Sequence, residues 1–257
     1  MKMKYFFIIV LALLLTACKN DKQTDEIEKD SKISELKITP ISHATMVLEY
    51  NGKTIYVDPT GGKDAFEALP KADYILITDI HSDHLNLNTI EALDLNNTKI
   101  ITPEAVYEKL PKNLREITST LINGAKEDFK TFKVEAIPMY NLREEALKFH
   151  TKGRGNGYVL TFGKERVYIS GDTEDIPEMR KLRAIDKAFI CMNLPYTMTV
   201  NNAADAVLEF KPKQVYPYHY RGTEGFSNVD KFKSIIINNT KDIEVVQLDW
   251  YPNSKEK

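Results

Sequence analysis

Four potential metal ligands lie within six positions, directly after an apolar segment. Asp79, His81, Asp83 and His84 follow residues 74–78, which are rich in β-branched and aromatic side chains. The apolar segment has the length and composition of a buried β-strand. Charged groups are costly to bury unless they are paired or bound to a metal. The segment therefore predicts a metal site at the end of a strand.

Two further apolar runs end in ligands of the same kinds. Asp172 follows residues 167–170, and His219 follows residues 215–218. Taken singly, Asp172 is typical of a turn and His219 of a core or surface histidine. Because the ends of strands in α/β folds converge on one crevice, we expect the three segments to meet. Imidazole and carboxylate ligands suit zinc, manganese or iron, and a chain with only two cysteines excludes a thiolate site.

The elements that must position these residues alternate between hairpins and strand–helix units. An Asn51-Gly52 turn joins the first strands, and the returning strand ends at Asp58-Pro59. Further strands are expected at 99–102, 158–162, 166–170, 188–192, 214–217 and 243–250, and helices at 85–95, 103–110, 175–182, 203–210 and 229–237. This mixture predicts an α/β fold of stacked sheets flanked by helices.

The N-terminus has the pattern of a secretory signal. Residues 1–17 combine a basic start with a short apolar run, which is too short for a membrane span, and small residues precede Cys18. This resembles a bacterial lipoprotein signal, with Cys18 as the acylated residue; an ordinary signal peptide is the alternative. Residues 18–33 are almost wholly polar and predict a tether, and residues 34–257 predict one domain.

The charge balance bears on partners and location. The full chain carries a formal charge of −2, and cleavage removes two lysines, which leaves −4. No basic face is implied, so we expect no nucleic-acid partner. Two or more acyl chains on Cys18 would anchor the protein to a membrane. We therefore expect a lipid-anchored protein of the cell envelope that faces outside the cytoplasm.

The ligand-bearing segments resemble those of a known superfamily. Asp79-x-His81-x-Asp83-His84 resembles the H-x-H-x-D-H motif of the metallo-β-lactamase superfamily. Gly171-Asp172-Thr173 resembles its bridging-aspartate motif, and His219 its last histidine. Residues 42–59 resemble the opening hairpin of the branch that includes ascorbate-6-phosphate lactonase. The resemblance implies an αββα sandwich of two mixed sheets, with the site at one edge of both sheets.

The resemblance also implies two metal positions, one of them altered. Asp83, His84 and His219 complete one position, and Asp172 bridges to the other. At the altered position Asp79 stands where the family has a histidine, and Asn141 replaces a mid-chain histidine, so that His81 is the remaining strong nitrogen ligand. His150 is an alternative ligand, or a surface histidine. We expect one or two Zn²⁺ ions, with Mn²⁺ or iron as alternatives.

The expected activity is hydrolysis of an ester, a lactone or a phosphodiester, including a lipid-derived one, by a metal-bound hydroxide. Asp83 would orient the nucleophile and His81 would help to protonate the leaving group. Arg154, in a glycine-rich segment, is expected to hold an anionic group of the substrate unless the segment is only a connector. Tyr218 and Arg221 are further predicted substrate contacts. The alternatives are a non-catalytic metal- or ligand-binding lipoprotein on the same fold, and redox chemistry at iron.

Overall fold

A computed structural model describes residues 35–252. The predicted signal, the tether and Cys18 lie outside the described residues and stay predictions. Ser34–Lys257 forms one compact unit. Among the helices of the described range, none is both long enough and apolar enough to cross a membrane.

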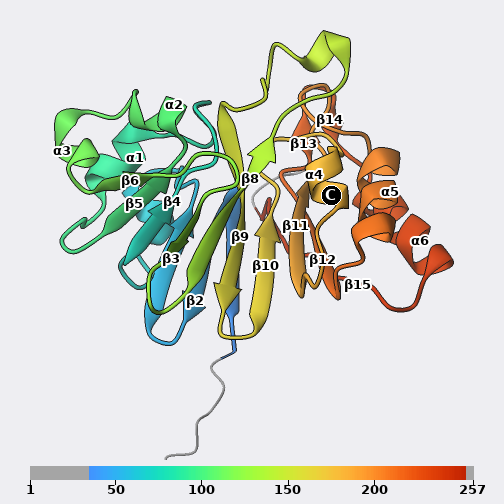
Figure 1. The fold of residues 1–257 in the computed structure, drawn as a ribbon, viewed down its shortest axis with the longest axis horizontal. Coiled ribbons are helices and arrows are strands. Elements are labelled where there is room, and N and C mark those ends of the chain that lie inside the picture. Colours follow the sequence, from blue (N-terminus) through green and yellow to red (C-terminus); the bar gives the residue numbers. More distant parts are fainter. Residues whose placement is uncertain (1–34, 253–257) are drawn as a thin grey trace, which may run out of the picture. The chain divides into compact units, whose positions relative to one another are not determined.

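The first sheet has six strands in sequential order (Figure 1). They are β1 (Lys37–Ser42), β2 (Thr45–Tyr50), β3 (Lys53–Val57), β4 (Tyr74–Leu76), β5 (Lys99–Thr102) and β6 (Thr118–Thr120). Strands β1 to β3 are antiparallel, whereas β3 to β6 run parallel. The predicted Asn51-Gly52 turn joins β2 and β3, and both residues have positive φ, as a tight hairpin requires.

The second sheet has seven strands in the order β15-β12-β11-β10-β9-β8-β7. They are β7 (Lys126–Asp128), β8 (Lys133–Met139), β9 (Gly155–Phe162), β10 (Glu165–Ile169), β11 (Lys187–Cys191), β12 (Gln214–Tyr218) and β15 (Glu244–Val245). Strands β7 to β10 are antiparallel, and β10, β11, β12 and β15 are parallel. A small hairpin of β13 (Arg221–Gly222) and β14 (Gly225–Phe226) follows β12.

Helices lie on the outer side of each sheet (Figure 1). Beside the first sheet are α1 (Leu87–Ala92), α2 (Glu104–Tyr107) and α3 (Lys112–Arg115), and beside the second are α4 (Pro177–Arg180), α5 (Val200–Phe210) and α6 (Val229–Asn239). Two short 3₁₀ helices, η1 (Lys63–Phe66) and η2 (Glu144–Ala146), occur in connections. The predicted αββα sandwich of two mixed sheets is confirmed.

The two faces of the first sheet bury different clusters. Met46 and Leu48 belong to the large core that also contains Tyr158 of the second sheet. Val47, on the opposite face of β2, belongs to a smaller cluster with Ile90 of α1. This division follows from the alternation of side chains along a strand, and it leaves the strand ends at one edge free to carry polar loops.

Four expected elements are shorter than the sequence suggested. The strand expected at 243–250 is limited to β15, because the chain then turns inward and buries Trp250 against the rings of Phe189 and Tyr218. The helix expected at 103–110 covers only α2, and Pro111 is the N-cap of α3. The helices expected at 85–95 and 175–182 are limited to α1 and α4. None of these changes affects the strand ends that carry the candidate ligands.

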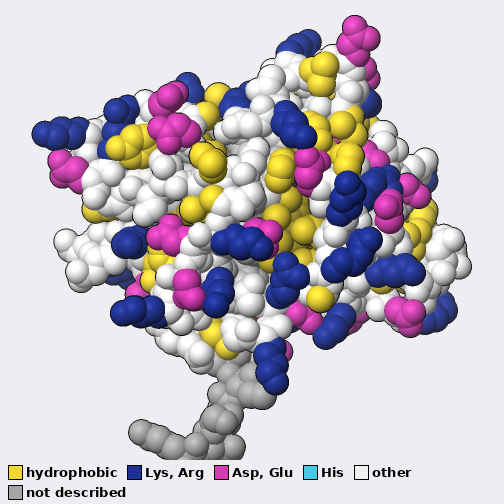
Figure 2. Space-filling model, viewed as in Figure 1, with side chains coloured by type: hydrophobic (Ala, Val, Ile, Leu, Met, Phe, Trp, Pro, Cys, Tyr) yellow, Lys and Arg dark blue, Asp and Glu magenta, His cyan; other side chains and the backbone are white. Residues whose placement is uncertain are grey.

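Charged side chains of both signs are interspersed over one face of the molecule. Figure 2 shows Lys and Arg side chains among Asp and Glu on the face that is viewed. This agrees with the small net charge of the sequence. The expected absence of a nucleic-acid partner stays a prediction.

Candidate metal centre

The loop after β4 carries the ligands of the first sheet. The chain leaves the strand at Ile77, and backbone bonds from His84 and Leu85 to the His81 carbonyl close a tight turn. Asp79 and the His84 side chain are fully buried, whereas the side chains of His81 and Asp83 are 40% and 45% exposed. The turn thus presents two ligands to the interior and two toward solvent.

The second sheet supplies the remaining ligands from three connections. His150 lies between β8 and β9, Asp172 follows β10, and His219 follows β12. Gly171 delivers Asp172, because it has a φ of 61° and a Cβ there would lie 2.5 Å from the Met139 sulfur. Both conditions favour glycine at this position.

The seven side chains form two groups that share one carboxylate. Asp79, His81 and His150 make one group, and Asp83, His84 and His219 the other, with the ligand atoms of each group within 4.8 Å of one another. Asp172 joins them. Its Oδ2 lies 3.4 Å from the Nε2 atoms of both His84 and His150, and its Oδ1 lies 3.3 Å from His219 Nε2.

The donor atoms fit a pair of bound cations. His84 Nε2, His150 Nε2 and Asp172 Oδ1 are buried and have no hydrogen bond of good geometry among the described residues. Buried polar atoms without partners are rare and call for an explanation such as an ion. The other ring nitrogen of His150, Nδ1, lies 3.1 Å from the Tyr196 carbonyl oxygen. Because a carbonyl can only accept, this contact places the proton on Nδ1 and leaves Nε2 free to bind a cation.

An outer shell that the sequence analysis missed orients His84. Asp58, at the end of β3, is fully buried, and its Oδ2 lies 2.8 Å from His84 Nδ1. It also accepts hydrogen bonds from the Thr78 backbone at 2.7 Å and the Thr78 hydroxyl at 2.6 Å. A carboxylate behind a histidine is a common arrangement at metal sites, because it fixes the tautomer and raises ligand basicity.

Asn141 lies behind His150 rather than in a ligand group. Its side-chain nitrogen donates to the carbonyls of Ala146 and Tyr196, at 2.9 and 2.7 Å, and lies 3.2 Å from His150 Nδ1. The Asn141 backbone also donates to the His150 carbonyl. His150, the alternative ligand, therefore belongs to a ligand group, and Asn141 contacts it from behind. The Asn141 amide oxygen is buried without a hydrogen-bond partner among the described residues, and its role as a ligand stays a prediction.

Arg154 faces a carboxylate of the protein. Its Nε and Nη2 donate to the two oxygens of Asp79, at 3.0 and 2.8 Å, and Nη2 also donates to the Phe149 carbonyl. His81 Nδ1 approaches the same Asp79 Oδ2 at 2.6 Å. The fork geometry expected of Arg154 is present, but Asp79 occupies it in place of a substrate anion.

Replacing Arg154 with leucine is expected to destabilise the metal-free protein by about 3 kcal/mol, because it removes the bidentate donor of the buried Asp79 carboxylate and leaves His81 Nδ1, at 2.6 Å, as its remaining close partner. We expect a smaller loss in the metal-loaded protein, since a cation bound to Asp79 supplies the missing charge. Urea unfolding with a chelator and with saturating zinc measures both values. Lys152→Leu is the matched control, because Lys152 pairs with Glu178 at the surface. Equal losses in the two forms would argue against Asp79 as a ligand.

The other two predicted substrate contacts occupy different environments. Tyr218 has no exposed surface, and its hydroxyl accepts a hydrogen bond of 2.9 Å from the Gly171 backbone. It supports the loop that carries Asp172 and is not accessible to substrate, which corrects that prediction. Arg221 is exposed at the start of β13, close after His219, and stays a predicted contact.

In the metal-free protein the candidate ligands shift one another's pKa values. Burial alone lowers the pKa of His219, but Asp172 and Asp83 outweigh it and raise the pKa to about 9. The pKa of His84 is likewise raised, against burial, by Asp172 and Asp58. Burial raises the pKa of Asp172, yet the surrounding imidazoles bring it well below its usual range. A cation that binds here must displace the histidine protons.

A cavity of about 430 Å³ opens onto the ligands. Its walls include His81, Asp83, His150 and Asp172, together with Ser82, Phe149, Asn193 and Tyr196. Within the described part of the chain, no Lys or Arg side chain belongs to this lining. The cavity gives a small molecule access to both ligand groups.

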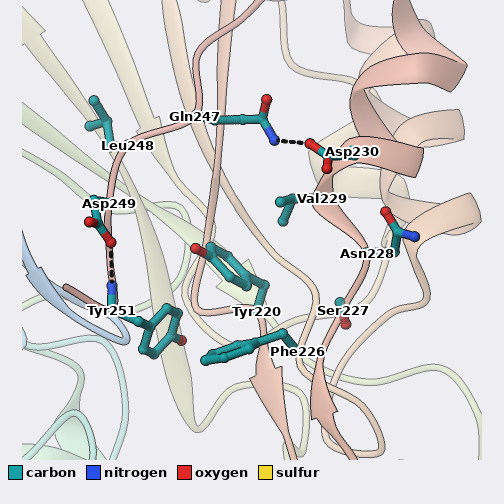
Figure 3. A pocket seen from close by; sticks show the side chains of 10 residues that line it. All are labelled: Tyr220, Phe226, Ser227, Asn228, Val229, Asp230, Gln247, Leu248, Asp249 and Tyr251. Carbon is teal, nitrogen blue, oxygen red and sulfur yellow. Dashed lines mark hydrogen bonds between the residues drawn. The ribbon is translucent and has the colours of Figure 1, made fainter. Parts of the chain in front are cut away.

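A second cavity, of about 540 Å³, lies beyond the aromatic residues that follow His219 (Figure 3). Tyr220, Phe226 and Tyr251 form one side, and the Gln247–Asp230 hydrogen bond lies on another. Tyr251 also reaches His43, whose Nδ1 lies 3.4 Å from its hydroxyl. Although this cavity is larger, the cluster of ligand atoms without partners lies in the first one, to which we assign the chemistry.

A sandwich of two mixed sheets, with paired ligand groups at its edge, defines the metallo-β-lactamase fold. Residues 37–219 match the family model described as the Beta-lactamase superfamily domain. UPF0173 metal-dependent hydrolases of Geobacillus thermodenitrificans and Nanoarchaeum equitans are similar to this chain. The first is 32% identical over 194 residues, covering 72% of this chain and 85% of the relative. The second is 30% identical over 189 residues, covering 72% and 84%.

A solved structure adds to these relatives. The crystal structure of a metal-dependent hydrolase from Parabacteroides distasonis is 41% identical, with a TM-score of 0.76, and the match covers 85% of this chain and 94% of that one. The chain belongs to the β-lactamase superfamily, as its motifs indicated. The lactonase-like branch and the lipoprotein anchor stay predictions.

Proposed function

We infer that this protein is a metal-dependent hydrolase that cleaves an ester, a lactone or a phosphodiester at a site for two cations. The observation that carries this conclusion is the position of Asp172 between two groups of ligands, in contact with His84, His150 and His219. A single shared carboxylate would bring two bound cations close enough to act on one substrate. The names of the relatives support the same reaction class.

Four imidazoles and three carboxylates would hold the cations. Asp79, His81 and His150 would hold one ion, Asp83, His84 and His219 the other, and Asp172 both. Bound divalent cations supply Lewis acidity, which polarises the scissile group and makes water a nucleophile near neutral pH. Zn²⁺ is the proposed ion, because imidazoles with carboxylates suit it well, and Mn²⁺ or iron are the alternatives.

Two half-exposed side chains face the cavity and are suited to proton transfer. Asp83, 3.4 Å from His219 Nε2, accepts a proton from the attacking water. The oxygen of that water bonds to the acyl carbon or phosphorus as the bond to the leaving oxygen breaks. The proton taken up by Asp83 would then pass to that oxygen, with His81 at the cavity wall assisting the transfer, so that Asp83 is ionised again at the end of the cycle. In the metal-free protein the pKa of Asp83 is held low, against burial, by His219 and His84, so the carboxylate is ionised.

Replacing Asp83 with alanine is expected to lower kcat by about 100- to 10,000-fold, because the site loses its base and one ligand. Turnover of a lactone, a phosphodiester and a carboxylic ester is measured together with metal content. Asp64→Ala, at an exposed position of η1, is the control. Activity that persists in Asp83→Ala at unchanged metal content would contradict the assigned role.

Location and partners are proposed from the sequence alone. Cys18 is proposed to carry the lipid that anchors the protein in the cell envelope, outside the cytoplasm. The tether at 18–33 would then separate the domain from the membrane, and the substrate would be a small or lipid-derived molecule.

A further inference from the structure

Exposed hydrophobic residues gather around the mouth of the metal cavity. Among residues 35–252, the large hydrophobic side chains that are exposed include Leu142, at 48%, and Leu147, at 45%. Both lie in the loop between β8 and β9, which also carries His150. Leu194 and Tyr196, in the loop after β11, are exposed as well, and Tyr196 lines the cavity. At the top of Figure 2, over the β8–β9 loop of Figure 1, hydrophobic side chains lie between charged ones.

Hydrogen bonds from Arg143 join the two loops. Arg143 donates to the carbonyls of Pro195 and Thr197, at 3.0 and 2.8 Å. The buried Glu174 accepts from the backbones of Leu142 and Arg143, and from the Arg143 side chain at 2.6 Å. The exposed side chains therefore stand on a preformed rim, so that binding there requires little ordering of the protein.

An aromatic wall connects this rim with the ligands. Phe149 and Tyr196 both line the cavity, and their rings meet edge to face with centroids 5.0 Å apart. Leu147 and Leu194 each lie two residues from one of these rings in the sequence, so the exposed leucines and the cavity wall belong to the same two loops. A substrate whose reacting group lies at the cations extends along this surface.

Two cationic side chains near the cavity are paired with carboxylates, and a third lies on the aromatic wall. Arg154 is engaged with Asp79, and Lys152 with Glu178 at 2.7 Å. Lys148 Nζ lies over the Phe149 ring, 5.0 Å from its centroid. The cavity lining within the described residues holds no Lys or Arg, and its Phe149 and Tyr196 rings offer a matching surface to an apolar chain of the substrate.

We propose that the substrate carries an apolar acyl chain, which lies against Phe149, Tyr196 and the rim formed by Leu142, Leu147 and Leu194. The proposal rests on the proposed hydrolase function of the same cavity. Among the substrates considered above it selects those with such a chain, and it places the chain-length specificity in the two loops that Arg143 joins.

Chain-length dependence tests the proposal on the metal-loaded protein. p-Nitrophenyl acetate, butyrate, hexanoate and octanoate share one leaving group and differ only in apolar length. We expect kcat/KM to rise by about two- to fourfold for each methylene that the rim covers. Equal kcat/KM values along the series would overturn the proposal and leave the hydrolase function intact. Failure to turn over any ester, lactone or phosphodiester would overturn both.

Surface variants assign the effect to the rim. In Leu142→Asn/Leu147→Asn the ratio of octanoate to acetate kcat/KM is expected to fall by about tenfold or more. Ile122→Asn is the matched control, because Ile122 is 71% exposed and belongs to neither loop. An unchanged ratio in the double variant would overturn the proposal. If that variant instead loses binding to phosphatidylcholine vesicles, the rim contacts a membrane and the proposal is likewise overturned.

Discussion

Asp172→Asn is expected to remove both cations and to lower kcat by more than about 100-fold. Asp172 is within 3.4 Å of imidazole nitrogens from both groups, so its charge serves both cations. The loss exceeds the 10- to 100-fold that is typical of an outer-shell partner, because a bridging carboxylate contacts the ions themselves. Elemental analysis after gel filtration, together with turnover of the preferred substrate, gives the two readouts.

The neighbouring Asp175 offers a matched control for this experiment. Its carboxylate pairs with Arg180 and accepts from Asn202, and it takes no part in the ligand groups. Asp175→Asn should therefore keep the wild-type metal content and kcat. An Asp172→Asn protein that still bound two ions and retained wild-type turnover would show that the two groups do not depend on a shared carboxylate.

Asp58→Ala is expected to destabilise the metal-free protein by about 3 kcal/mol or more, because it leaves the Thr78 backbone donor unpaired and removes the carboxylate from His84 Nδ1, whose remaining partner is the Thr78 hydroxyl at 2.9 Å, in a fully buried site. Zinc affinity should fall about 10- to 100-fold, since His84 loses the group that orients it. Chemical denaturation and competition with a chromogenic chelator measure the two effects separately.

Asp73→Asn is the control for the Asp58 variant. Asp73 also accepts a backbone hydrogen bond in the first sheet, from Thr54 at 2.9 Å, but it lies at the start of β4, away from the ligands. This variant should leave zinc affinity unchanged. An Asp58→Ala protein with wild-type zinc affinity would mean that His84 is held by the surrounding backbone and not by the carboxylate.

Sequence patterns predicted those strands and candidate ligands whose positions depend on short segments of the chain. The strand expected at 99–102 is β5, with the same bounds, because an apolar β-branched run inside a parallel sheet has few alternatives. The ligands of the first sheet were found together because one turn holds all of them. Asp172 and His219 were found because each follows an apolar strand, and strand ends meet at the sheet edge.

Positions that depend on long-range packing were not predictable in the same way. Asn141 and His150 are separated by a loop whose path is set by Glu174 and Arg143, and no local pattern shows which of the two side chains reaches Asp172. Tyr218 lies in an interior strand with both faces buried, so alternation could not separate a core position from a cavity position.

The role of Asp58 was hidden for a related reason. An aspartate before proline at the end of a strand is typical of a turn, and its partner His84 is distant in the sequence. The available signal was that Asp58 ends one strand and that the neighbouring strand leads to the histidine motif. The sequence predicted that Arg154 is a fork donor to an anionic group. The carboxylate that accepts its hydrogen bonds is that of Asp79, which is distant in the sequence and is brought close to Arg154 only by the fold.

The origin of the ligands in two different sheets has a mechanical consequence. Each ion would be held on one side by the loop after β4 and on the other by loops of the second sheet, and would act as a reversible cross-link between the two layers. Ions that bind only the folded state stabilise it by about 2.7 kcal/mol at a hundred times their dissociation constant. The cohesion of the sandwich would then vary with the free metal concentration around the protein, so that the same ions that make the site reactive also hold its two halves together.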